Sequence, residues 1–191
     1  MERPVTDTHK GRTTKDGIRI HETADFAGMH AAGKLAATIL DEIAEHVVVG
    51  QTTAEIDRLI EEKVNAAGAK SATIGYKGYE HASCISINHV VCHGIPGDKK
   101  LKDGDIVNID VTVIVDGWHG DTSRMYLVGK TPIKASKLVQ VTYACMMLGI
   151  DPAKPGHRMA DVPHAIQTHD QPTPHSGGRH PRGQGPGQQA R

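Results

Sequence analysis

The feature that most limits how this chain can fold is an alternating run of apolar residues from Val107 to Val115. Every odd position of the run is Val or Ile, whereas the first three even positions are polar. Because successive side chains of a strand point to opposite faces, the pattern predicts a strand with one buried face. Asp116 and Gly117 follow at once, and a two-residue hairpin turn favours this dipeptide because both positions need positive φ. The segment therefore predicts a β-hairpin.

The turn also sets the register of the hairpin and places Asp121 opposite Thr112. Asp110 is then a diagonal neighbour of Asp121 on the same face. Two adjacent carboxylates repel each other unless a cation or a proton lies between them. We interpret the pair as candidate metal ligands, with His93 and His119 as candidates for binding a metal or a substrate. The alternative is structural, with both carboxylates engaged in hydrogen bonds or turns of the hairpin itself.

Apolar residues at helical spacing predict two helices before the hairpin. The first is expected from Ala24 to about Val47. Thr52 and Glu55 fit a capping box that opens the second helix. Residues 69–83 then indicate a loop, and a strand is expected over residues 83–91.

Beyond the hairpin, the same spacing predicts a helix over residues 133–149, closed by Gly149. A short amphipathic segment over residues 159–169 is expected to bury Met159, Val162 and Ile166. The polar residues 1–17 indicate a flexible N-terminal arm. Residues 170–191 are rich in Pro and Gly and lack large apolar side chains, which predicts a disordered tail. The remaining residues, 18–169, are expected to form one folded domain.

Charge and cysteine content exclude several classes of protein. The 191 residues include 22 basic and 22 acidic ones, so the formal net charge is zero. This balance predicts no general attraction to nucleic acid or to an anionic membrane. Three cysteines cannot all pair and form no C-x-x-C motif, which indicates reduced thiols in a cytoplasmic protein. The sequence shows neither an apolar run of transmembrane length nor a signal peptide.

Three segments in and around the hairpin carry a family resemblance. They are SINHVVCHGIP from Ser86 to Pro96, DGDIVNIDV from Asp103 to Val111, and HGDTS from His119 to Ser123. Residues 84–129 closely resemble bacterial type I methionine aminopeptidases, and the resemblance extends more loosely from about Ile18 to about His169. It implies an α+β fold, namely the N-terminal half of a pita-bread fold, with an antiparallel sheet and helices packed on one face.

The resemblance also implies a chemistry and a substrate. Members of the family remove the initiator methionine from nascent proteins whose second residue is small, and they use two divalent metal ions (Co, Mn, Fe or Zn). Asp110 would chelate one ion, Asp121 would bridge both, and His93 would contact the substrate rather than the metal. In the family, a stretch similar to residues 69–83, in which Tyr76, Gly78 and Tyr79 cluster, helps to shape the pocket for the methionine side chain. The implied partner is the N-terminal peptide of a nascent protein, and contact with the ribosome stays open.

The sequence departs from the family where the second half would supply a histidine and two glutamates as ligands and another histidine for the substrate. The last glutamate in the chain is Glu80, so nothing after it supplies those carboxylates. We therefore expect a domain truncated after its N-terminal half, which holds metal weakly through Asp110 and Asp121 and has no assured catalytic residue. The alternatives are a catalytically inactive fragment, a non-catalytic binding relative, or another hydrolase of the fold that acts on proline peptides or creatine.

Overall fold

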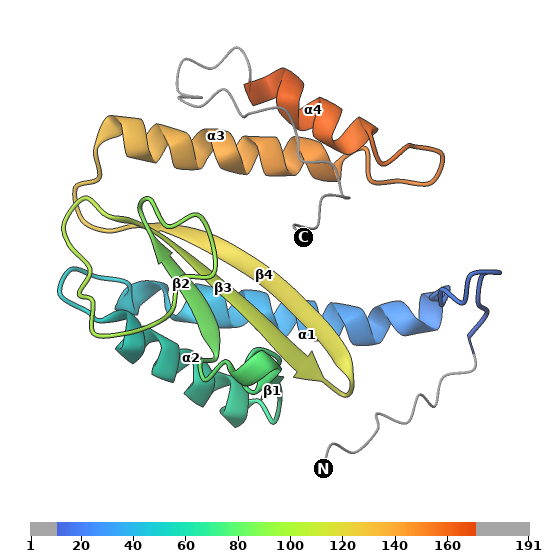
Figure 1. The fold of residues 1–191 in the computed structure, drawn as a ribbon, viewed down its shortest axis with the longest axis horizontal. Coiled ribbons are helices and arrows are strands. Elements are labelled where there is room, and N and C mark those ends of the chain that lie inside the picture. The colour runs from blue at the N-terminus through green and yellow to red at the C-terminus, as the bar shows by residue number, and fades with distance from the viewer. Residues whose placement is uncertain (1–10, 171–191) are drawn as a thin grey trace, which may run out of the picture. The chain divides into compact units, whose positions relative to one another are not determined.

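The computed structural model describes residues 11–170, which divide into two compact units between Gly129 and Lys130. The first unit is coloured from blue to yellow in Figure 1, and the second from orange to red. The expected tail falls almost wholly on residues 171–191, outside the described residues, as do residues 1–10 of the expected arm. Within residues 11–170, no helix is both long and apolar enough to cross a membrane.

Within residues 11–129, the first unit begins with two α-helices and a short 3-10 helix between them. A four-stranded antiparallel sheet follows, and a second 3-10 helix lies between its first and second strands in the sequence. The elements are α1 (Thr23–Glu42), η1 (Ala44–His46), α2 (Thr53–Ala66), β1 (Lys70–Ser71), η2 (Tyr76–Gly78), β2 (Ser83–Ile87), β3 (Ile106–Val115) and β4 (Trp118–Leu127). β4 pairs with β3 along its whole length, and both β2 and β1 also pair with β3. The α+β fold expected from the sequence is therefore confirmed.

The β3–β4 hairpin has the expected register. Val115 pairs with Trp118 and Thr112 pairs with Asp121. The two turn residues, Asp116 and Gly117, have φ angles of 49° and 85°, as a two-residue hairpin turn requires. The odd positions from 107 to 113 are fully buried, which confirms the buried face of the strand.

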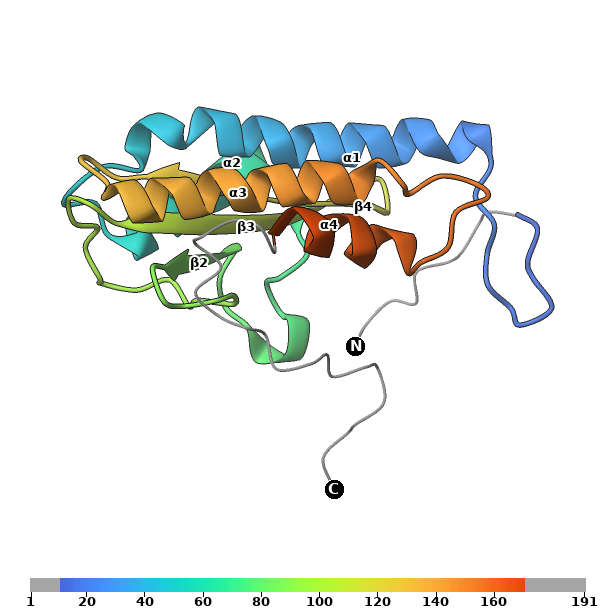
Figure 2. The ribbon, with the colours of Figure 1, turned by 90° about the horizontal axis from the view of Figure 1, so that it is seen from above.

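The core lies between that buried face of the sheet and the apolar stripes of α1 and α2. Figure 2 shows α1 running along one side of the sheet. Thr52 and Glu55 form the expected capping box, in which the Glu55 amide donates to the Thr52 hydroxyl and the Thr52 amide donates to the Glu55 carboxylate. Each large aliphatic side chain buried here contributes about 2 kcal/mol, and the main ones are Ile39, Leu40, Ile43, Ile56, Ile60, Val64, Val107, Ile109, Val111 and Val113.

The strand expected over residues 83–91 is shorter than predicted and ends at Ile87. Asn88 adopts a left-handed conformation with φ 54° and uses its side chain locally. Its amide nitrogen donates to Asp105 and its amide oxygen accepts from the Ile106 backbone. This turn leaves Val91 exposed. The prediction of a loop over residues 69–83 was also incomplete, because this segment contains the short elements β1 and η2.

The described part of the second unit, residues 130–170, contains α3 (Ile133–Ile150) and α4 (Asp161–Asp170). Gly149 does not close α3 as predicted, because the helix continues through it to Ile150. Gly149 is buried, and a Cβ there would lie 2.8 Å from the Cδ1 atom of Ile166 on α4. The glycine therefore allows the two helices to approach closely. Met159 precedes α4 and is 88% exposed, so its predicted burial was wrong.

Candidate metal centre and adjoining pocket

Asp110 on β3 and Asp121 on β4 lie on the sheet face opposite the core. Asp110 pairs with Ser123 and Asp121 pairs with Thr112, so the two carboxylates are the diagonal neighbours that the turn predicted. The Thr112 hydroxyl donates a 3.0 Å hydrogen bond to Asp121 Oδ1. This bond orients the more exposed of the two carboxylates.

The two carboxylates interact electrostatically. Burial raises the pKa of Asp110, and the charge of Asp121 and a hydrogen bond with it raise the pKa further. His93 acts in the opposite direction and lowers the pKa of Asp110. His93 therefore acts electrostatically on Asp110. A cation placed between the two carboxylates would relieve their repulsion.

His93 lies on the loop after β2 and has a positive φ of 55°. The next residue, Gly94, holds the loop against β2, because Ile85 donates to the Gly94 backbone oxygen and the Gly94 amide donates to the Ser86 hydroxyl. A Cβ at position 94 would lie 2.2 Å from the Ile85 oxygen, so only glycine fits. His119 is exposed on the same face of β4 as Asp121, next to the hairpin turn.

The described residues supply only part of a metal-binding site. Within residues 11–170, no group of three or more His, Cys, Asp and Glu side chains is placed to hold a metal ion. Two carboxylate oxygen donors suit a divalent cation. The chemical type of these ligands therefore suits a divalent metal, but two ligands are fewer than such a site needs.

An apolar hollow of about 500 Å³ adjoins the carboxylate pair. It is lined by Thr73, Tyr76, Lys77, Gly78, Tyr79, Cys84, His93 and Ile95. Cys84 on β2 pairs directly with Asp110 on β3, so the wall of the hollow and the carboxylate are adjacent across the sheet. From the family resemblance, His93 is assigned to the substrate and residues 69–83 to the pocket for the methionine side chain. Cys84 and Ile95 are not assigned to that pocket from the sequence. In the sequence, Cys84 and Ser86 alternate with Ile85 and Ile87. This pattern indicates that the Cys84 and Ser86 side chains face away from the core.

Comparison with known proteins fits this arrangement of carboxylates and pocket. The model of metallopeptidase family M24 matches residues 27–187. The chain belongs to metallopeptidase family M24. This membership makes it a relative of enzymes that depend on divalent metals, and it confirms the resemblance expected from the motifs.

Among M24 proteins, the chain is 54% identical over 152 residues to the methionine aminopeptidase of Rickettsia prowazekii, covering 80% of this chain and 59% of that relative. The crystal structure of methionine aminopeptidase from the same organism superposes with a TM-score of 0.79 at 52% identity, over 81% of this chain and 62% of that one. A prolidase from Pyrococcus furiosus superposes with a TM-score of 0.71 at 19% identity, over 80% and 44%, and shares the fold alone. The chain thus spans less than two thirds of the length of these relatives.

Proposed function

We propose that this site serves the metal-dependent hydrolytic removal of an N-terminal methionine from nascent proteins whose second residue is small. The observation that carries the proposal is the pairing of Cys84 with Asp110, which sets an apolar hollow directly beside two adjacent carboxylates. A methionine side chain in the hollow would bring its peptide bond toward the carboxylates. The curated relative that is 54% identical is named a methionine aminopeptidase, which supports the same reaction.

Each residue has a defined role in this proposal. Asp110 and Asp121 would hold divalent metal (Co, Mn, Fe or Zn), and Thr112 orients Asp121. A metal bound there supplies Lewis-acid polarisation and an activated water. His93 contributes a hydrogen bond to the substrate at the edge of the hollow. Tyr79 and its neighbours in the wall enclose the thioether, which makes favourable contacts with aromatic rings.

A second candidate function is peptide binding without hydrolysis. It is the alternative left open by the sequence, in which Asp110 and Asp121 lack the remaining ligands of the family. Under-coordinated metal binds weakly and is poorly positioned for catalysis. In either case we propose the N-terminal segment of a nascent protein as partner, with the ribosome as its source. We also propose a cytoplasmic location, which is consistent with Cys84, Cys92 and Cys145 forming no disulfide.

Release of methionine from a Met-Ala-Ser peptide tests the proposal. The purified protein would be titrated with Mn²⁺, Co²⁺ and Fe²⁺, beside an Asp121→Ala control and a Met-Leu-Ser peptide whose second residue is bulky. Metal-dependent release from the first peptide, lost in the control and weak with the second, is the expected result. A folded protein that binds Met-Ala-Ser but never cleaves it would establish the second candidate in place of the first.

A further inference from the structure

A buried carboxylate on α2 lies behind the wall of the hollow. Asp57 is 6% exposed and occupies the apolar stripe of the helix, between Ile56 and Ile60. Burying a carboxylate is costly unless hydrogen bonds compensate for lost hydration. Asp57 has three such contacts, since its Oδ1 accepts from the Ser83 amide at 2.8 Å and the Ser83 hydroxyl at 2.6 Å, and its Oδ2 lies 3.1 Å from His81 Nδ1.

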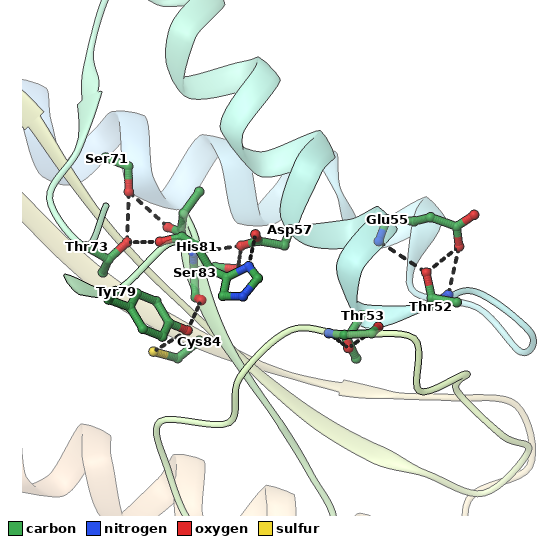
Figure 3. A network of polar contacts seen from close by, with 12 residues as sticks. Thr52, Thr53, Glu55, Asp57, Ser71, Thr73, Tyr79, His81, Ser83 and Cys84 are labelled. Carbon is green, nitrogen blue, oxygen red and sulfur yellow. Dashed lines mark hydrogen bonds and ion pairs between the residues drawn. The ribbon is translucent and has the colours of Figure 1, made fainter. Parts of the chain in front are cut away.

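These contacts continue into the wall of the hollow, as Figure 3 shows. The Tyr79 hydroxyl donates a 2.8 Å hydrogen bond to the Ser83 backbone oxygen, and the Cys84 thiol donates to the Tyr79 hydroxyl over 3.6 Å. Tyr79 and Cys84 both line the hollow. A continuous chain of hydrogen bonds therefore joins Asp57 to the two side chains through Ser83.

The neighbouring loop is tied to the same short segment. The Thr73 hydroxyl donates to the His81 backbone oxygen at 2.7 Å, and the Ser71 hydroxyl donates to the Ala82 oxygen at 3.2 Å. Thr73 also lines the hollow. Both edges of the wall thus depend on where residues 81–83 are held, and Asp57 holds that segment at His81 and at Ser83.

The combination of Asp57, His81 and Ser83 is not a nucleophilic triad. Ser83 is fully buried, and its hydroxyl donates directly to Asp57 rather than to His81. A serine nucleophile needs an exposed oxygen and a histidine that takes its proton. The arrangement therefore supports position rather than chemistry.

We propose that Asp57 is a positioning residue for the substrate hollow, which fixes the Tyr79 hydroxyl and the Cys84 thiol by holding Ser83 and His81. The inference rests on the proposed function for the identity of the substrate, a methionine side chain. Its geometric part, the coupling between Asp57 and the wall, holds without any substrate. The two parts can therefore be tested separately.

Alkylation of Cys84 by iodoacetamide measures the geometric part. The reaction would be followed by mass spectrometry in a Cys92→Ser background, with Asp57→Asn, Tyr79→Phe and the double variant, all shown to be folded by circular dichroism. Asp57→Asn should accelerate alkylation about fivefold, a size typical of coupled neighbours. The acceleration should vanish in the Tyr79→Phe background, because the coupling runs through that hydroxyl. Glu62→Gln, which removes an exposed charge from the same helix, should leave the rate unchanged.

Two outcomes would overturn the proposal. The first is an unchanged alkylation rate in folded Asp57→Asn protein. The second is an equal acceleration with and without the Tyr79 hydroxyl, since a lost charge or a general loosening would act in both backgrounds. If Asp57→Asn does not fold, Ser83→Ala carries the same test, because it removes the 2.6 Å hydrogen bond and keeps the backbone one.

Turnover of Met-Ala-Ser tests the substrate part where the chain releases methionine. Asp57→Asn should raise KM about fivefold with a smaller change in kcat, because the side-chain pocket acts in binding. If the KM is unchanged while the reactivity of Cys84 is altered, the substrate part of the proposal is overturned and the geometric part stands. Absence of turnover in the parent protein would count against the proposed function and leave the thiol result standing.

Discussion

Gly120 on β4 lies directly against the backbone of Ala32 on α1. A Cβ at position 120 would be 2.2 Å from the Ala32 carbonyl carbon and oxygen, and 2.5 Å from the Gly33 nitrogen. Asp121 is the next residue along the strand and points to the opposite face. The close approach of helix and strand therefore fixes the backbone from which a candidate metal ligand projects.

Gly120→Ala should destabilise the protein, because backbone atoms cannot move aside as a flexible side chain can. We expect a loss of about 1–3 kcal/mol in the free energy of unfolding, the usual range for overpacking, measured by urea denaturation. Gly33→Ala is the matched control, since it lies in α1 and a Cβ there meets nothing within 4 Å. That variant should be stabilised by about 0.5–1 kcal/mol through its higher helix propensity. Equal stability of the two variants would contradict the packing explanation.

The hairpin and its carboxylate pair could be predicted because their determinants are local. The alternation of apolar and polar residues predicted which face of the strand is buried, and Asp116 and Gly117 predicted the turn. Together they predicted that Asp121 lies opposite Thr112. The family motifs added the fold. The metal roles of Asp110 and Asp121 and the substrate role of His93 stay predictions.

The family resemblance pointed to residues 69–83 as part of the pocket, but the position of the hollow beside Asp110 could not be predicted because it depends on which strands pair. No local pattern near Cys84 in the sequence predicts that β2 pairs with β3, the pairing that places Cys84 opposite Asp110. Asp57 was missed for a similar reason, since an acidic residue on a helix ordinarily faces solvent. Its partners, His81 and Ser83, lie 24 and 26 residues further along the chain.

Thr112→Val should weaken binding of Mn²⁺, because it removes the hydroxyl that orients Asp121 and keeps the shape of the side chain. Loss of such an orienting bond typically lowers metal affinity by about 10-fold or more. Thr112→Ser retains the hydroxyl and should bind Mn²⁺ nearly as well as the parent. Isothermal titration calorimetry would measure both affinities. A serine variant as weak as the valine variant would show that the hydroxyl is not what matters.

Asp121→Asn should lower the pKa of Asp110 in metal-free protein, since the neighbouring negative charge is one cause of its elevation. Burial is the larger cause, so the pKa should fall only part of the way to the usual value. A raised pKa in the folded state means that Asp110 favours folding below the unfolded-state pKa of about 4. That contribution is lost as the pH rises through the raised pKa, and Asp121→Asn should shift the loss to lower pH. Carboxyl NMR titration measures the change directly, and an unmoved or higher pKa would contradict the pairing.

Tyr126→Phe should alter stability in alkaline solution. The Tyr126 hydroxyl donates a 2.6 Å hydrogen bond to the Leu40 backbone oxygen, and burial raises the pKa of Tyr126 to about 12. An unfolded tyrosine titrates near about 10. The folded state therefore holds its proton more tightly, and the resulting stability is complete below about pH 10 and is lost as the pH rises toward the folded pKa.

The variant lacks both the hydrogen bond and the proton, so at neutral pH it should lose about 1–2 kcal/mol in the free energy of unfolding. Between about pH 10 and 12 the parent protein loses its tyrosine contribution while the variant has none to lose, so the two unfolding free energies should converge. Urea denaturation at pH 7 and at several alkaline values measures the difference and cancels the titration of other groups common to both proteins. A constant difference across this range would mean that the Tyr126 proton is not linked to folding, and that its contact with Leu40 acts through packing alone.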